Sequence, residues 1–193
     1  MDDRLIRLTM PSENRARRLE LLQQVFLSQV AMRHGHLSVV ENAMGGIDAV
    51  AVWLGPGTRV APADRAALAE ARRSLEGDAH RAANAAAATI AALRPADEHF
   101  MVARVGTRVD RRRRGLGRAV LHPLVREADE TEQPVFAPAT SRLALEFLEA
   151  MGFEAQGHAR LPSGADVWGM VRPPRRLRRP RGAGAASANA PPG

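Results

Sequence analysis

A strand, a glycine-containing turn and an amphipathic helix follow one another in the second half of this 193-residue chain. The segment "HFMVARVGT" (99–107) has the alternation of a half-buried strand, and four arginines (111–114) then lead into "GLG" (115–117). After this turn, leucine and valine recur at the three- and four-residue spacing of one helical face. A strand that passes through a short turn into a helix is a basic unit of α/β sheets, so this feature predicts an α/β fold.

The other segments predict the partners of this unit. We expect helices over 12–30, 62–94 (in two pieces around Gly77) and 141–151, and strands over 36–41, 47–54, 134–139, 153–160 and 164–171. Ser12 is the candidate N-cap of the first helix. Strands and helices alternate in the middle of the chain, whereas pairs of strands joined by short turns lie on either side. The sheet should therefore be mixed, only partly parallel, and flanked by helices.

Composition limits the class of protein. The chain has no cysteine, which excludes disulfides and thiolate metal sites, and we expect no metal. It has no apolar run long enough to span a membrane, and its N-terminus lacks the apolar core of a signal peptide. We therefore expect a cytoplasmic protein without membrane contact, with a single domain over 1–172.

The excess positive charge gathers at the C-terminus. Six arginines and no acidic residue lie in "RPPRRLRRPRGAGAASANAPPG" (172–193), and the whole chain has a net charge of only +7. Because this segment is rich in proline, glycine and alanine and has little to bury, we expect a disordered tail over 173–193. Loose contact with polyanions and a solvated extension without a set purpose are both compatible with such a tail.

The glycine turn before the helix is a candidate phosphate site. A helix N-terminus presents free peptide N–H groups and the positive end of the helix dipole, and glycines leave room for phosphate oxygens. The dinucleotide-binding fingerprint is excluded because its third glycine is Val120 here, and the Walker pattern is excluded because the chain has no lysine. A flexible, solvated helix start remains the alternative. Nucleic-acid binding by the arginines is disfavoured because no aromatic residues alternate with them.

The spacing Arg112-x-x-Gly115-x-Gly117 matches the Arg/Gln-x-x-Gly-x-Gly/Ala signature of the GNAT acyltransferase superfamily. A later helix that ends in "MGF" (151–153) and the final segment "LPSGADVWGM" (161–170) agree with the same family. Over roughly residues 2–173 the chain resembles GNAT enzymes, and its pattern is most similar to the puromycin N-acetyltransferase-like subgroup.

The resemblance implies a variable acceptor half over about 1–95 and a CoA-binding half over about 96–172. Acetyl-CoA would bind with its diphosphate on the turn before the long helix and its pantetheine arm beside strand 99–107, where the sheet splays away from strand 134–139. The cofactor-binding residues that it implies are Val105, Gly106, Thr107, Arg112, Arg113, Arg114, Gly115, Leu116, Gly117 and Arg118.

The chain departs from the family pattern at two points. The tyrosine that usually protonates the leaving thiolate is Leu148 here, and the chain contains no tyrosine at all. The first strand and most of the first helix of the family fold have no counterpart ahead of Asp2-Asp3, so we expect a fold that lacks them. Glu98 and His99, at the start of the cofactor strand, are candidate bases. The alternative is that both residues lie at the exposed start of this strand and have no catalytic role.

These observations leave three hypotheses. The first is an N-acetyltransferase that transfers acetyl from acetyl-CoA to the amine of a small molecule, an antibiotic being one candidate. The second is a non-catalytic or very slow acyl-CoA-binding relative, because Leu148 cannot act as the general acid. The third, a nucleic-acid-binding protein, ranks last, and we expect no specific nucleic acid as a partner. A homodimer is left open.

Overall fold

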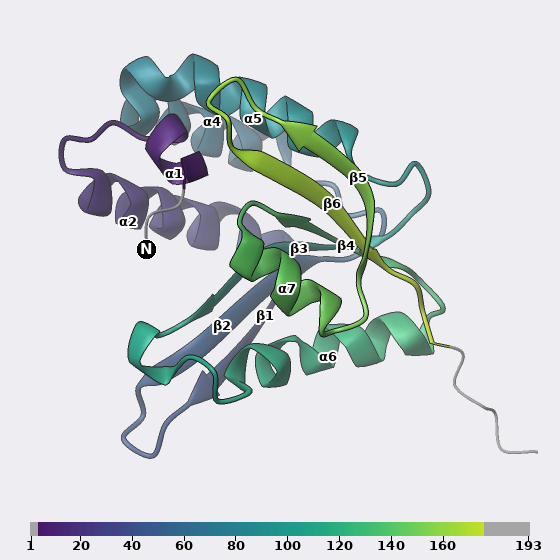
Figure 1. Ribbon diagram of the computed structural model, residues 1–193. Coiled ribbons are helices and arrows are strands. Elements are labelled where there is room, and N and C mark those ends of the chain that lie inside the picture. The colour runs from purple at the N-terminus through teal and green to yellow at the C-terminus, as the bar shows by residue number, and fades with distance from the viewer. Residues whose placement is uncertain (1–3, 176–193) are drawn as a thin grey trace, which may run out of the picture.

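The computed structural model describes residues 4–175 and contains one six-stranded mixed sheet, shown in Figure 1. The strands are β1 (His36–Glu41), β2 (Ile47–Leu54), β3 (Phe100–Thr107), β4 (Val135–Ala139), β5 (Glu154–Arg160) and β6 (Asp166–Arg172). Their order across the sheet is β1-β2-β3-β4-β6-β5. Only the β3–β4 pair is parallel, and the other neighbours are antiparallel. The predicted mixed, partly parallel α/β fold is confirmed.

Helices connect and cover these strands. They are α1 (Arg4–Thr9), α2 (Arg15–Phe26), the π-helical turn η1 (Leu27–Ala31), α3 (Met32–His34), α4 (Pro62–Glu76), the 3₁₀ turns η2 (Gly77–Ala79) and η3 (Val109–Arg111), α5 (His80–Ala92), α6 (Leu116–Glu130) and α7 (Arg142–Glu149). The predicted break near Gly77 is confirmed. No helix in residues 4–175 is both long and apolar enough to cross a bilayer.

The predicted start of the first long helix is wrong. Ser12 does not cap it, because α2 begins three residues later and Asn14 occupies the N-cap position with a left-handed backbone (φ 52°). Asparagine tolerates this conformation better than most residues, so a turn over residues 11–14 precedes the helix. The predicted tail over 173–193 lies outside the described residues from position 176 onward.

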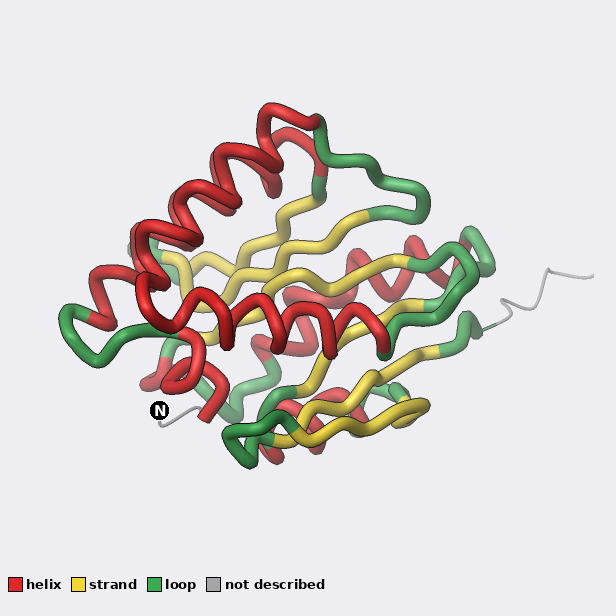
Figure 2. The backbone as a smooth tube through the Cα atoms, turned by 90° about the horizontal axis from the view of Figure 1, so that it is seen from above, coloured by secondary structure: helices red, strands yellow, loops and turns green. Residues whose placement is uncertain are grey.

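The helices form a layer on each face of the sheet. On one face α6 packs against β1, β2 and β3, while α7 packs against β4 and β6. On the opposite face lie α2 with η1, α4, and the pair α1–α5. In Figure 1 α4 and α5 lie above the sheet and α6 below it, and Figure 2 shows the helices of the upper layer crossing the strands. The sheet therefore has a packed core on both sides.

Most of the core belongs to the layer of α6 and α7. Leu121 and Leu124 of α6 are 1% and 0% exposed, and burial of each such side chain contributes roughly 1.5–3 kcal/mol. They pack with buried residues of β2, β3, β4 and β6. On the other face Phe26 and Val30 cover Val52 of β2. This packing fixes the N-terminus of α6 beside the end of β3.

Strands β3 and β4 separate soon after they meet. Their pairing is limited to Phe100 with Val135 and Met101 with Phe136, after which β3 continues to Thr107 along β2 alone. A register shift makes Ala103 an extra residue in β3, and such a bulge bends a strand and increases its twist. The predicted splay between these two strands is present in the structure, and it opens one side of β3.

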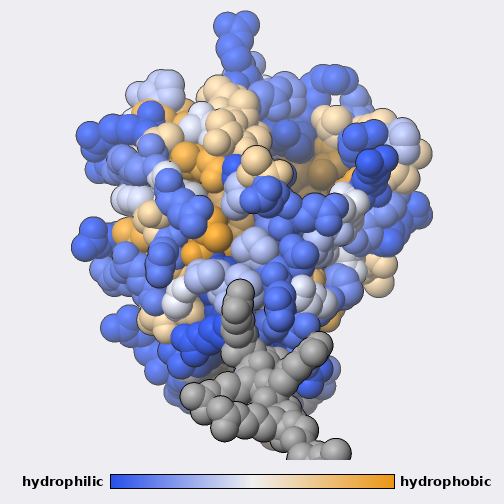
Figure 3. Space-filling model, turned by 90° about the vertical axis from the view of Figure 1, so that its right-hand side faces the viewer, coloured by the Kyte–Doolittle hydropathy of each residue, from blue (hydrophilic) through white to orange (hydrophobic). Residues whose placement is uncertain are grey.

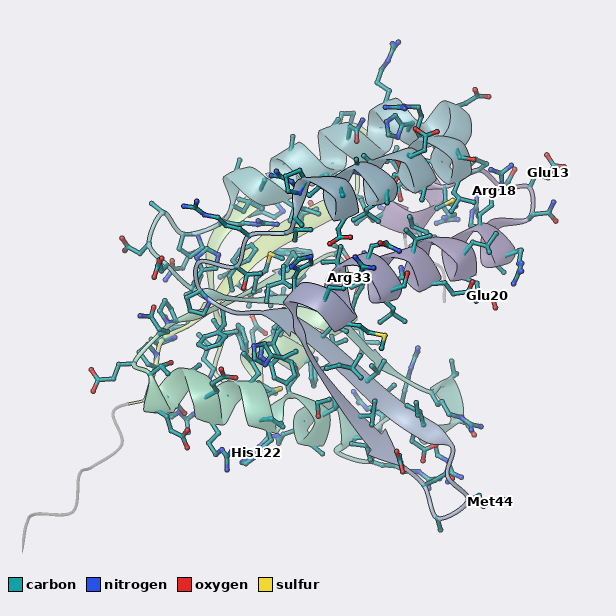
Figure 4. The ribbon with its side chains drawn as sticks, turned by 180° about the vertical axis from the view of Figure 1, so that it is seen from behind. Glu13, Arg18, Glu20, Arg33, Met44 and His122 are labelled. Carbon is teal, nitrogen blue, oxygen red and sulfur yellow. The ribbon has the colours of Figure 1, made fainter. Side chains whose placement is uncertain are left out.

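A buried carboxylate joins the helical layer to the end of α3. Asp64 of α4 is 5% exposed, and its oxygens accept hydrogen bonds from Arg33 Nη1 at 2.9 Å and contact His34 Nε2 at 2.7 Å. Figure 4 shows Arg33 pointing toward α4 from the end of the α2–α3 segment. The pKa of the Asp64 carboxyl lies below its usual range. The hydrogen bond with His34 has the largest effect on this pKa, and the positive charge of Arg33 lowers it further.

We expect the contribution of Asp64 to stability to depend on pH. Since its folded-state pKa is lowered, the contribution is complete above the unfolded value of about 3.9 and is lost as pH falls through the folded value. The measurement is the unfolding free energy of the wild type and of Asp64→Asn between pH 7 and pH 3. The difference between the two proteins should shrink at the acidic end, and a constant difference would contradict the ion-pair assignment.

Candidate functional site

The splay of the sheet opens into a cleft of about 870 Å³. It lies between the end of β3, the N-terminus of α6 and one side of α7. The residues that line it are Val105, Gly106, Thr107, Arg112, Arg113, Gly115, Leu116, Gly117, Arg118, Ser141, Leu143, Ala144, Glu146, Phe147, Ala150 and Met151. All the predicted cofactor residues except Arg114 are therefore brought together around one cavity.

The turn at the start of α6, which lines this cleft, has free peptide N–H groups. Those of residues 113–118 have no hydrogen-bond acceptor within the described chain, and the first bond of α6 joins the Ala119 N–H to the Gly115 carbonyl at 3.0 Å. Arg113 and Gly115 both have positive φ, 63° and 79°. Left-handed residues in a turn direct successive N–H groups into one concavity, which binds anions, and the helix dipole adds partial positive charge. We call residues 113–118 the amide cradle.

The two glycines of the turn, Gly115 and Gly117, are favoured at their positions for different structural reasons. Gly115 is left-handed and has open space where a Cβ would be, so its backbone conformation is what disfavours other residues. A Cβ on Gly117 would lie 3.0 Å from Cε2 and 3.2 Å from Cζ of Phe147. Gly117 therefore permits close packing of α6 on α7, which the sequence alone did not indicate.

The four consecutive arginines divide into two pairs. Arg111 Nε lies 3.6 Å from the carboxylate of Asp48, a buried residue at the start of β2, and Arg112 donates a weak hydrogen bond (3.4 Å) to the Thr107 carbonyl. These contacts hold the loop against the sheet. Arg113 and Arg114, in contrast, have no hydrogen-bond or ion-pair partner in residues 4–175.

Further charges fasten the loop that precedes the cradle. Arg108 donates hydrogen bonds to Asp110 at 3.1 and 3.2 Å, and this interaction lowers the pKa of the Asp110 carboxyl. On the far side of the cleft, Arg118 Nη2 donates a hydrogen bond to the Ala150 carbonyl at 2.9 Å, which joins α6 to the end of α7. The cradle is thus held from both sides.

The open side of β3 forms a second wall of the cleft. Beyond Met101 no strand within residues 4–175 pairs with β3 on the side of β4. In an antiparallel pair such as β2–β3 alternate residues direct their N–H and C=O groups away from the partner strand. The side chain of Val105 in this part of β3 is 41% exposed and lines the cleft. This edge can accept an extended ligand as an added strand.

Helix α7 supplies the third wall. Ser141 caps it by accepting a hydrogen bond from the Ala144 N–H at 3.2 Å, and Ala144, Phe147 and Met151 then face the cleft. The sequence predicted a helix here but did not assign these residues to the site. Their three- and four-residue spacing, which places them on one helical face, was the available signal. Leu148 is 3% exposed and belongs to the main core instead of the lining.

Glu98 and His99 lie outside this cleft. They line a second cavity of about 220 Å³, bounded by the loop after β2 and the loop after α5. His99 Nδ1 lies 2.7 Å from the Asp97 carbonyl. A carbonyl only accepts hydrogen bonds, so Nδ1 carries the proton and Nε2 of the neutral ring has a free lone pair. The ring also contacts Phe136 edge-on, at 5.8 Å between centroids.

No family model matches the chain. Among solved structures, it is similar to a histone acetyltransferase HPA2 and related acetyltransferase from Corynebacterium glutamicum, with a TM-score of 0.68, 21% identity, and coverage of 92% of this chain and 86% of that one. A structure assigned to the GNAT family from Desulfovibrio desulfuricans matches with a TM-score of 0.49 at 17% identity, covering 89% of each chain. An acetyltransferase from Bacillus cereus matches with a TM-score of 0.46 at 13% identity, covering 84% and 94%.

The Corynebacterium match extends over nearly the whole chain. At 21% identity the match shows the fold of the chain and does not show its activity. The chain has the fold of the GNAT acetyltransferases.

Proposed function

We propose that this protein is an acetyl-CoA-dependent N-acetyltransferase that acts on the amine of a small molecule. The observation that carries the proposal is the amide cradle of residues 113–118, whose N–H groups have no acceptor in the described chain, beside the open edge of β3. The resemblance of the turn and the last hairpin to the puromycin N-acetyltransferase-like subgroup supports the same activity. In this proposal residues 96–172 bind the cofactor and residues 1–95 contribute most of the acceptor side.

The cradle fits the diphosphate of CoA. Hydrogen bonds from N–H groups to a charged acceptor contribute about 1.5–3 kcal/mol each, so a few of them give useful affinity without any side chain. The unpaired guanidinium groups of Arg113 and Arg114 add positive charge at the same place. Neutral main-chain donors also explain why the site needs no lysine.

The pantetheine arm fits the wall formed by β3 and α7. The unpaired peptide groups of β3 near Val105 and Thr107 can pair with its amides, while Phe147 and Met151 offer apolar contact opposite. An arm laid along β3 from the cradle leads toward Met101, where β3 and β4 part.

When bound, acetyl-CoA supplies an acetyl thioester. The residues of the chain align the acceptor amine with it and receive the proton that the amine must lose. Nε2 of His99 is the candidate proton acceptor, because its lone pair is free and His99 lies two residues before Met101, the last residue of β3 that pairs with β4. Glu98 is the alternative. The thiolate leaves without a tyrosine hydroxyl at position 148, and loss of one general acid typically costs about 10²–10⁴-fold in rate.

A second candidate function has an observation in its favour. Leu148 is packed in the core, and the described residues that line the cleft include no tyrosine, histidine or aspartate. A protein that binds acyl-CoA without turning it over would have the same cradle. The two candidates differ only in catalysis.

Two measurements test the proposal. Calorimetry with CoA should show binding, and release of free thiol from acetyl-CoA should accelerate when a primary amine is added. Thiol release that depends on the amine supports the transferase, whereas CoA binding without such release supports the non-catalytic relative. Absence of CoA binding would contradict both.

A further inference from the structure

The second cavity contains charges that do not neutralise one another. Arg94, Asp97, Glu98 and His99 all line its 220 Å³. The guanidinium of Arg94 and the carboxylates of Asp97 and Glu98 have no ion-pair or side-chain hydrogen-bond partner anywhere in the described chain. Partial desolvation lowers the pKa of Arg94. Unpaired side chains of both signs at one small cavity are able to bind a ligand that carries both charges.

This cavity lies next to the place where the strands part. Met101 lines it and is the last residue of β3 that pairs with β4. Met101 and His99 share one face of β3. Val105, which lines the cofactor cleft, pairs with Ala51, and Ala51 is packed in the core under α6. The cofactor cleft therefore lies on the α6 side of the sheet, opposite to the face that Met101 and His99 share. A group that reaches the end of the cleft would thus meet one that enters from the second cavity.

The volume of the second cavity limits the size of the ligand that it can bind. A volume of about 220 Å³ is below the roughly 300–1,000 Å³ of pockets that hold drug-sized ligands. It corresponds to about seven water molecules at roughly 30 Å³ each. Figure 3 shows the side of the molecule at the right of Figure 1, where hydrophilic side chains surround small apolar areas. We therefore expect a compact polar ligand, or the polar end of a larger one.

We propose that the second cavity binds an acceptor of the amino-acid type, with its carboxylate at Arg94 and its amine at Glu98 and His99. This inference rests on the proposed acetyl transfer, for which it names the substrate class. Before the transfer the bound ammonium would lose one proton to solvent. The neutral amine nitrogen would then form the bond to the acetyl carbon, the bond from carbon to sulfur would break with its electron pair leaving on the thiolate, and the second proton of the nitrogen would pass to His99 Nε2. Glu98 would attract the ammonium form of the acceptor, and Arg94 would exclude simple cations.

The turnover experiment compares matched acceptors. Short α- and ω-amino acids are assayed beside amines of the same length without the carboxylate, with the wild type, Arg94→Gln and Arg81→Gln. Arg81 is also an exposed arginine of this helical region but lines neither cavity, so its variant controls for net charge. We expect Arg94→Gln to lower kcat/KM for amino acids at least tenfold relative to the matched amines, through KM, and Arg81→Gln to have no such effect. An equal effect on both classes of acceptor would overturn the inference.

A binding experiment makes the inference independent of turnover. Calorimetry with the CoA-loaded protein should show binding of the amino acid to the wild type, weaker binding to Arg94→Gln, and weaker binding to Glu98→Gln. If CoA binds but the amino acid does not, the inference is wrong even though the cofactor site is intact. If amino acids bind but no acceptor accelerates thiol release, the inference stands and the proposed catalysis is wrong.

Discussion

Replacement of Gly115 by valine is expected to raise the dissociation constant for CoA by about 10- to 100-fold. Gly115 has φ 79°, a conformation in which a β-branched residue is a genuine outlier. The substituted backbone would relax toward negative φ and turn the neighbouring peptide planes, so that one or more N–H groups of the cradle no longer point into the cleft. Loss of one hydrogen bond to a charged group, about 1.5–3 kcal/mol, gives this range. The measurement is isothermal titration with CoA.

Gly45 provides a matched control. It has φ 77° and, like Gly115, open space where a Cβ would be, but it lies in the hairpin between β1 and β2. Its neighbour Met44 is 96% exposed and projects at the far end of the molecule in Figure 4. Gly45→Val should cause similar backbone strain and leave CoA affinity unchanged. Equal losses of affinity in both variants would mean that general destabilisation is responsible.

Replacement of Asp129 by alanine is expected to lower the unfolding free energy by about 3–5 kcal/mol. Arg172 of β6 is 2% exposed and donates two hydrogen bonds to the Asp129 carboxylate, at 2.8 and 2.9 Å, and the Arg175 N–H donates a third at 2.7 Å. Without the carboxylate a buried guanidinium would lose its counter-charge, which is the costly way to break such a pair. Urea denaturation at neutral pH measures the change.

Glu130 is the control for this prediction. It is the next residue of α6, and it pairs with Arg126 at 3.6 Å with both side chains more than half exposed. Surface pairs of this kind contribute about 0.3–0.5 kcal/mol, so Glu130→Ala should have little effect. Similar losses in the two variants would show that the side chain of Arg172 finds other acceptors.

The pH dependence of the Asp129 contribution has a definite sign. Burial raises the pKa of this carboxyl, but the hydrogen bonds from Arg172 and the Arg175 N–H outweigh it, and the net pKa is lowered. The stabilisation should therefore be present above the unfolded value of about 3.9 and decline as pH falls through the folded value.

The sheet could be predicted from the sequence because its signals are local. Strands 36–41 and 47–54 have the predicted bounds, since β-branched and apolar residues gather between glycine turns. The break at Gly77 and the start of α6 after Gly115 follow from glycine in the same way. The first cap was misplaced because Ser12 and Asn14 are both good N-cap residues, and the sequence prediction chose the first of them.

The site was predictable only where one segment builds it. The turn over 112–118 carries its own signature, but α7 and the second cavity are formed by segments that only the fold brings together. Gly57 and Glu98 show this: the carboxylate lies 3.3 Å from where a Cβ on Gly57 would be, although the two residues are far apart in the chain. The division of the arginine run also depends on Asp48, which lies on another strand.

The most direct test of the central claim is the response of the cradle amides to CoA and to pantetheine, which lacks the diphosphate. In ¹⁵N-labelled protein, CoA should shift the amide proton resonances of residues 113–118, because these N–H groups would acquire charged acceptors. Pantetheine should leave them near their positions in the free protein. If CoA binds without moving these resonances, or if pantetheine moves them equally, the amide cradle is not a diphosphate site.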